Sequence, residues 1–244
     1  MFKLILTGIF LFLFFLVSLV IFIPLAIIGK FNKNRKDRIS YAIVTWALRV
    51  VFFISGAKLT VKGKENIPKD TAVLYVANHR SFFDIVTGYI TIPPLCGFVS
   101  KKEIKKVPVL ASWMVRMNCL FLDRENIKEG MKTILQGVEQ LKSGISVFIF
   151  PEGTRGKTDD SLKEFKEGSL KMAEKAKVPI VPVAFNNTSA IFEDRFPRIK
   201  KAHVIMEFGE PIYIDSLEKE EKKHLGAYAH DKVKAMIENN KNLL

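Results

Sequence analysis

Residues 73–91 read VLYVANHRSFFDIVTGYIT, which combines an apolar run, a polar loop and the start of a helix. The run that ends at Ala77 is apolar and short, so it predicts a buried strand. Ser81 and Asp84 have the spacing of a capping box, which predicts that a helix begins there. The stretch therefore predicts a strand, a loop and a helix in succession, the unit from which layered α/β folds are built.

The same alternation continues through residues 58–244. The other expected strands are Leu59 to Val61, Cys96 to Val99, Val147 to Phe150, Ile180 to Phe185 and Val204 to Phe208. Asn126 with Glu129, and Ser161 with Glu164, repeat the capping-box spacing. We therefore expect an α/β domain whose central sheet is mostly parallel or mixed and is flanked by helices. Ligands bind to such sheets at the carboxyl ends of the strands.

Residues 1–57 differ from the rest and predict an anchor of two helices. The run from Leu4 to Gly29 has 26 residues without a charge, which is long enough to span a bilayer. A basic cluster follows, and then a second apolar run from Ile39 to Ala57 contains Arg49 and predicts an amphipathic, interfacial helix. Core helices of a soluble bundle are the weaker alternative. Whether the first helix spans the bilayer or lies in one leaflet stays open; if it spans, the basic cluster places the remainder in the cytoplasm.

The composition favours an anionic partner. The chain has 38 Lys and Arg against 25 Asp and Glu, which gives a net charge of +13. Nucleic acid, phosphate-bearing metabolites and anionic lipid all suit this charge. Cys96 and Cys119 form no CxxC pattern and have no His at ligand spacing, which excludes a disulfide framework and a zinc finger and indicates a reducing compartment.

Two loops at the expected carboxyl ends of strands carry side chains suited to chemistry. In the first, His79 precedes Asp84 by five positions. An imidazole that is held by a carboxylate can take a proton from a hydroxyl group, although Asp84 would also be explained as a plain helix cap. The second loop, PEGTRG at 151–156, predicts a phosphate cradle of backbone N–H groups beside Arg155, or else a surface turn. P-loop, GxSxG and GxGxxG patterns are absent, and His79 has no neighbour that would complete a metal site.

Four blocks, in this order along the chain, resemble the glycerolipid acyltransferase family. The blocks are NHxxxxD at residues 78–84, FLDR at 121–124 for the family's FIDR, FPEGTR at 150–155 and VPIVPV at 178–183. The resemblance covers roughly residues 58–210 and is greatest to the bacterial lysophosphatidic acid acyltransferase branch. One position departs from the pattern, since Asn118 stands where the family usually has Gly.

The resemblance implies direct transfer of a fatty acyl group from acyl-CoA or acyl-carrier protein to the sn-2 hydroxyl of 1-acylglycerol 3-phosphate (lysophosphatidic acid), which forms phosphatidic acid. It implies a membrane enzyme that works at the cytoplasmic face on anionic lipid, without cofactor, metal or nucleic acid. By this resemblance His79 is the general base and Asp84 orients it. The expected substrate-binding residues are Glu152, Gly153, Thr154, Arg155, Arg124 and Lys101. For Lys101, an ordinary solvent-exposed lysine is an equal alternative.

Three alternatives remain at this stage. The first is an acyltransferase or transacylase that acts on another lysolipid or on glycerol 3-phosphate. The second is a hydrolase or transacylase that uses Ser81 as nucleophile. The third is a non-catalytic protein that binds anionic lipid through residues 1–57.

Overall fold

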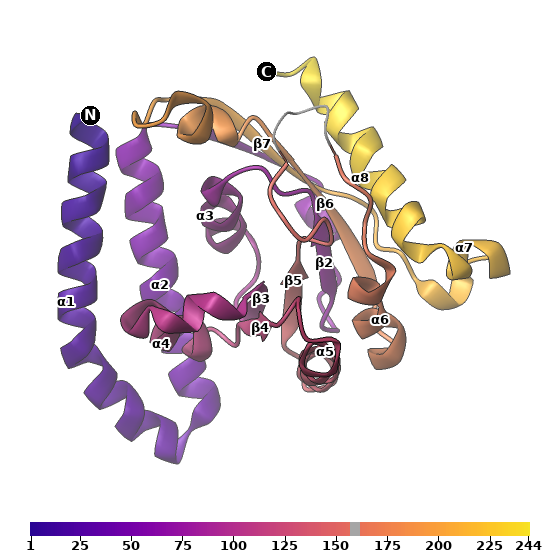
Figure 1. Cartoon of the computed structure of the whole chain (residues 1–244), viewed down its shortest axis with the longest axis horizontal. Helices are drawn as coiled ribbons and strands as arrows, with labels where there is room; N and C mark the ends of the chain where they lie inside the picture. The colour runs from indigo at the N-terminus through magenta and orange to yellow at the C-terminus, as the bar shows by residue number, and fades with distance from the viewer. Residues whose placement is uncertain (157–161) are drawn as a thin grey trace.

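The computed structural model describes residues 1–156 and 162–244, and it has a central sheet with helices on both faces and a long helical hairpin along one side (Figure 1). The seven strands lie in the order β1-β7-β6-β2-β5-β3-β4. They are β1 (Lys58–Lys62), β2 (Leu74–Ala77), β3 (Cys96–Lys101), β4 (Leu120–Leu122), β5 (Ser146–Ile149), β6 (Ile180–Asn186) and β7 (His203–Phe208). Neighbouring strands are parallel except for β6 and β7, which are antiparallel. The expected mixed sheet is confirmed.

Strand β4 was not among the predicted strands. It is three residues long and pairs with β3 at the edge of the sheet. Three residues are too few to show the alternation that identifies a strand, so the FLDR block was visible as a motif but not as a strand.

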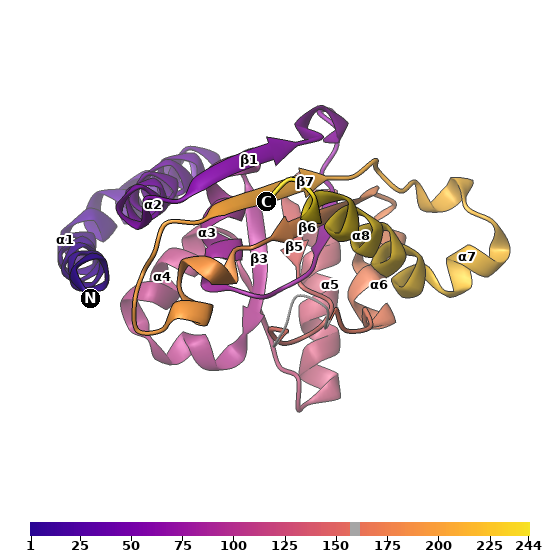
Figure 2. The ribbon, with the colours of Figure 1, turned by 90° about the horizontal axis from the view of Figure 1, so that it is seen from above.

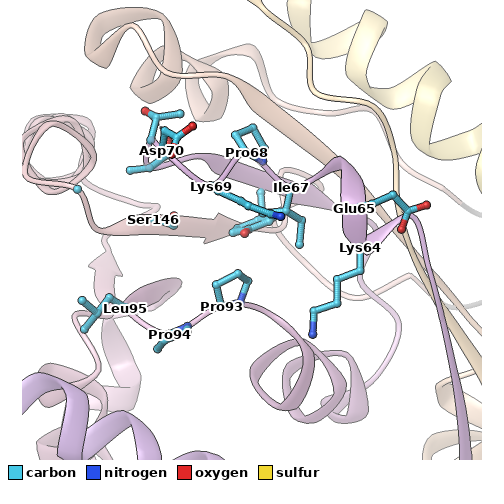
Figure 3. A pocket seen from close by; sticks show the side chains of 14 residues that line it. Lys64, Glu65, Ile67, Pro68, Lys69, Asp70, Pro93, Pro94, Leu95 and Ser146 are labelled. Carbon is cyan, nitrogen blue, oxygen red and sulfur yellow. Dashed lines mark hydrogen bonds between the residues drawn. The ribbon is translucent and has the colours of Figure 1, made fainter.

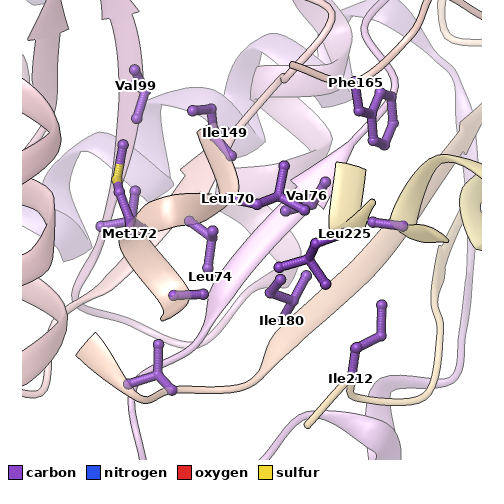
Figure 4. Packing of buried hydrophobic residues seen from close by; sticks show 14 of the residues in the cluster. Leu74, Val76, Val99, Ile149, Phe165, Leu170, Met172, Ile180, Ile212 and Leu225 are labelled. Carbon is purple, nitrogen blue, oxygen red and sulfur yellow. The ribbon is translucent and has the colours of Figure 1, made fainter. Parts of the chain in front are cut away.

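Alternate residues of the central strands face opposite layers. Leu74 and Val76 of β2 belong to a core with α5 (Ile127–Lys142), α6 (Glu167–Ala176) and α8 (Leu225–Lys241) (Figure 4). Tyr75 and Ala77 pack in a second core, on the face that α3 (Phe82–Thr91) covers. Figure 2 shows the two helical layers on either side of the sheet, with the short helix α7 (Lys219–Lys223) at the far end from the hairpin. Burial on both faces explains why these strands are apolar throughout.

Two of the predicted helix starts are confirmed. The Ser81 hydroxyl accepts the N–H of Phe83, and the reciprocal bond from the backbone of Ser81 to Asp84 completes the capping box of α3. The Asn126 side chain accepts the N–H of Glu129 at the start of α5. The third predicted cap, Ser161, lies outside the described residues.

Helices α1 (Phe2–Phe31) and α2 (Lys33–Ser55) form an antiparallel hairpin. Both are long and apolar enough to cross a membrane, by length and composition alone. One side of α1 packs on α4 (Pro108–Arg116), where the indole N–H of Trp113 donates to the Ser18 hydroxyl at 2.8 Å. Other residues of α1 expose apolar side chains, among them Phe12, Leu16, Val20, Ile23 and Ile27. The hairpin therefore lies along the domain and keeps a second, apolar surface exposed.

Candidate active site

The predicted site residues gather at one edge of the sheet. The strands β2, β5, β3 and β4 are consecutive neighbours and parallel, so their carboxyl ends lie at the same edge. His79 follows β2, the turn with Arg155 follows β5, Lys101 ends β3 and Arg124 follows β4. Because neighbouring strands are about 4.8 Å apart, the edge from β2 to β4 is about 14 Å long. Residues from four distant blocks of sequence thus line one elongated edge.

His79 and Asp84 form a hydrogen-bonded pair at this edge. Nδ1 of His79 lies 2.8 Å from Oδ2 of Asp84. Because a carboxylate only accepts hydrogen bonds, Nδ1 carries a proton, and in the neutral imidazole Nε2 then keeps its lone pair. The imidazole stacks on the ring of Phe150, with 4.0 Å between the ring centroids, and its side chain is 16% exposed. The ring is therefore held in one orientation while one side of it still reaches the surface.

The carboxylate of Asp84 is fully buried and serves the helix and the imidazole together. Besides His79, its Oδ2 accepts the backbone N–H groups of Arg80 at 2.7 Å and Ser81 at 2.8 Å. Its Oδ1 accepts the hydroxyl of Thr188 at 2.5 Å. The same side chain therefore caps α3 and contacts the imidazole of His79, and its role in catalysis stays a prediction.

Two residues that hold the site were missed as such by sequence reasoning. Thr188 is buried and follows β6, more than a hundred positions from Asp84, so no local pattern connects the two. Asn78 lies in the NHxxxxD block, but its role appears only in the structure. Its amide accepts the N–H of Phe185 at 2.8 Å and donates to the carbonyl of Phe185 at 2.9 Å. Both contacts tie the loop that carries His79 to strand β6.

Glu152 holds the protein's own backbone. One carboxylate oxygen accepts the N–H of His79 at 2.7 Å and the other accepts the N–H of Lys163 at 3.2 Å. The side chain is buried, and this burial raises the pKa of Glu152 above its ordinary value. The N–H of Gly156 also donates to the carbonyl of His79 at 2.8 Å. Glu152 therefore supports the loop that carries His79, and the contact of Glu152 with substrate stays a prediction.

The turn after β5 presents Arg155 at the surface. Gly153 has a φ of +76°, a conformation that favours glycine, while Thr154 and Arg155 are exposed. The guanidinium of Arg155 lies 4.1 Å from the ring centroid of Phe82, and its NH1 is 3.4 Å from Oε1 of Glu193. Phe82 is the first residue of α3, two positions before Asp84. The exposed cation is thus held beside the helix that carries Asp84.

The Ser81 hydroxyl is buried and hydrogen-bonded within the helix cap. Its hydroxyl donates to Oε2 of Glu193 at 2.6 Å and accepts the N–H of Phe83 at 2.9 Å. The side chain is fully buried. These contacts assign the hydroxyl to the cap of α3.

Lys101 and Arg124 lie further along the same edge. Both are exposed, two and three strands from β2 respectively. The preceding turn contains Asn118, which has a φ of +57°. Gly adopts this conformation freely and Asn tolerates it better than most residues, so the backbone at position 118 has a conformation that suits either residue.

A cavity of about 650 Å³ lies at the opposite edge of the sheet (Figure 3). It is lined by residues near the amino ends of β2, β3 and β5, among them Asp70, Leu95 and Ser146. None of the motif residues lines it, so the cavity and the candidate site are separate features.

Comparison with known proteins supplies the family. A family model described as Acyltransferase matches residues 58–186. The chain is 31% identical over 196 residues to a 1-acyl-sn-glycerol-3-phosphate acyltransferase of Saccharomyces cerevisiae, covering 80% of this chain and 63% of that protein. It is 29% identical over 211 residues to the protein of that name from Borreliella burgdorferi, covering 82% and 80%. For the protein of that name from Haemophilus influenzae the identity is 30% over 182 residues, covering 72% and 75%.

Several of these relatives are longer than the matched region. The chain spans less than two thirds of the yeast protein and about half of the chloroplast proteins of Brassica napus and Arabidopsis thaliana. The crystal structure of a 1-acyl-sn-glycerophosphate acyltransferase from Thermotoga maritima has the same fold, with a TM-score of 0.77 at 23% identity over 98% of this chain and 97% of that one. Since the family model covers more than half of the sequence and includes the His79, Arg124 and Arg155 blocks, the chain belongs to the acyltransferase family.

Proposed function

We propose that this protein is a membrane-bound acyltransferase that transfers a fatty acyl group to the sn-2 hydroxyl of 1-acylglycerol 3-phosphate, with acyl-CoA or acyl-carrier protein as donor. The observation that carries the proposal is the His79–Asp84 pair beside the exposed Arg155 turn. The names of the relatives, which are 1-acyl-sn-glycerol-3-phosphate acyltransferases, support the choice of acceptor.

The reaction follows from the free nitrogen of His79. Nε2 takes the proton of the acceptor hydroxyl as the oxygen attacks the thioester carbonyl, so a C–O bond forms and the C–S bond then breaks. The imidazolium returns its proton to the thiolate that leaves. Asp84 keeps Nδ1 protonated and stabilises the imidazolium while it exists. No acyl-enzyme is needed, which suits the burial of Ser81 in the helix cap.

The acceptor phosphate is assigned to Arg155, with Gly153 and Thr154 of the same turn. A guanidinium recognises phosphate through paired N–H groups, and this one is exposed and braced by Phe82. Lys101 and Arg124 lie further from His79 along the edge, where they are suited to the phosphate groups of the substrates.

The hairpin is assigned to the membrane surface. The Trp113 side chain of α4 contacts Ser18, Phe14 and Phe22 of α1, and these contacts hold the middle of α1 against the domain. The bond from Lys3 Nζ to the carbonyl of Ser55 at 2.6 Å joins the two helices of the hairpin to each other. A fully crossing α1 would carry Trp113 and its surroundings into the hydrocarbon or break these contacts. We therefore favour a hairpin that lies in one leaflet, with the domain on the cytoplasmic side, where both candidate donors are found.

The test is transfer of a labelled acyl group to 1-acylglycerol 3-phosphate in detergent, from acyl-CoA and from acyl-carrier protein in parallel. His79→Ala is expected to lower the rate by about 10²- to 10⁴-fold, because the general base is lost. Other lysolipids and glycerol 3-phosphate serve as competing acceptors. A folded wild-type protein that is inactive with every pair of substrates, or a fully active His79→Ala variant, would refute the proposal.

A further inference from the structure

The segment of residues 195–201, RFPRIKK, carries a concentration of exposed cations. Arg195, Arg198, Lys200 and Lys201 are all exposed, and the segment contains no carboxylate. Within the described parts of the chain, none of the four makes an ion pair with a carboxylate. Phe196 lies among them with 73% of its surface exposed. Exposed basic side chains around an exposed aromatic ring are the combination that binds the interface of an anionic membrane.

This segment is continuous with the hairpin. Ile199 and Ala202 pack in one apolar cluster with Leu4 and Leu11 of α1 and with Val51 of α2. The N–H of Lys58, just after α2, donates to the carbonyl of Ala202 at 2.9 Å. A Cβ atom placed on Gly56 would lie 3.9 Å from Cβ of Lys201, so the two residues are close neighbours. Figure 1 shows the segment beside the amino end of α1 and the carboxyl end of α2.

The same segment also reaches the candidate active site. The segment begins at the last residue of a short 3₁₀ helix, Glu193–Arg195. The carboxylate of Glu193 accepts the hydroxyl of Ser81 at 2.6 Å and the N–H of Phe82 at 2.7 Å, and it lies 3.4 Å from the Arg155 guanidinium. Residues 195–201 therefore begin two positions after Glu193, which contacts Arg155 of the proposed phosphate-binding turn.

We infer that residues 195–201 form a second membrane-binding element, which docks on the anionic surface of the bilayer and holds the acceptor site against it. The inference rests on the proposed membrane location of the hairpin and extends it to the catalytic domain. Phe196 enters the interface and the four cations contact lipid phosphates. The partner is a lipid surface, because the cations surround an exposed aromatic ring and adjoin the apolar hairpin.

The first test places a probe on the segment in the full chain. Phe196→Cys is labelled with an environment-sensitive fluorophore in a Cys119→Ala background, and Tyr213→Cys serves as the matched control. Tyr213 is an exposed aromatic residue that precedes α7, at the other end of the domain. On vesicles that contain phosphatidylglycerol, the probe at position 196 is expected to shift to the blue and to be quenched by brominated lipid, whereas the control probe stays in water. Equal water exposure of the two probes on vesicle-bound protein would overturn the inference.

The second test removes the charges. The Gln variant of Arg195, Arg198, Lys200 and Lys201 is compared with the Gln variant of Lys219, Lys222, Lys223 and Lys234, which removes four cations from α7 and α8. The first variant is expected to lose about tenfold or more of its rate on substrate in anionic vesicles and to keep its rate in neutral detergent. The second keeps both rates. A loss in detergent with acyl-carrier protein as the only affected donor would instead make the segment a protein-docking surface. Wild-type inactivity in detergent would refute the proposed function and leave the probe result standing.

Discussion

Replacing Thr188 by Val removes one hydroxyl from the site and keeps the shape of the side chain. That hydroxyl donates to Oδ1 of Asp84 at 2.5 Å, whereas the donors of residues 79, 80 and 81 all bond Oδ2. A hydrogen bond to a charged group contributes about 1.5–3 kcal/mol, and a buried carboxylate oxygen left without a donor costs a similar amount. We expect the variant to lose about this much stability.

Part of the same loss is expected in catalysis, because Asp84 is then held through Oδ2 alone and fixes Nδ1 of His79 less firmly. If about 1.4–2.7 kcal/mol of the lost energy appears in the transition state, kcat falls about 10- to 100-fold. The KM for each substrate stays within about twofold, because Thr188 lies behind the carboxylate and is buried. Thr188→Ser retains the hydroxyl and is expected to recover most of kcat.

The control is Thr87→Val on α3. This threonine is also fully buried, but its hydroxyl donates to backbone carbonyls of its own helix at 2.6 and 3.3 Å. Steady-state kinetics in detergent and thermal unfolding are measured for all three variants. The argument for Thr188 fails if Thr188→Val keeps wild-type kcat, or if Thr87→Val loses kcat to the same extent at equal stability.

Three further predictions concern the turns around the site. Arg155→Ala is expected to raise the KM for the acceptor at least about tenfold, with a smaller change in kcat. Arg155→Lys is expected to restore only part of the affinity for the acceptor, because a lysine lacks the paired N–H groups. An unchanged KM in Arg155→Ala would show that Arg155 does not bind the phosphate. Burial raises the pKa of Glu152 above its unfolded value of 4.5, so its contribution to stability is fully present below that pH and is lost as the pH rises through the folded pKa. Thermal unfolding should therefore show the wild type losing stability relative to Glu152→Gln between pH 4.5 and the raised pKa, and a pH-independent difference would contradict this. Asn118 has a φ of +57°, so Asn118→Gly is expected to change the free energy of unfolding by less than about 1 kcal/mol, whereas Asn118→Val should lower it by more than that. Equal denaturant midpoints for the two variants would show that this conformation carries no strain.

Much of the fold was predictable because its signals are local. Short apolar runs predicted six of the strands now seen in the seven-stranded sheet, and the capping boxes predicted the starts of α3 and α5. Strand β4 was missed because its three residues carry no periodicity. The candidates His79, Asp84 and Arg155 were likewise predictable, because each belongs to a motif block of only six or seven consecutive residues.

The sequence by itself determined the α/β class, the apolar hairpin and the chemical types of side chain at the site, since these depend on composition, period and spacing within a few residues. Only the tertiary structure decided which partners those side chains have. In the structure, Glu152 accepts the backbone N–H of His79, the Ser81 hydroxyl bonds Glu193 at the start of α3, and the Thr188 hydroxyl donates to Oδ1 of Asp84. These contacts join residues on different strands and loops, and the number of residues between them does not determine how far apart they lie in space. The order of the strands sets that distance, because it places the ends of β2, β5, β3 and β4 side by side.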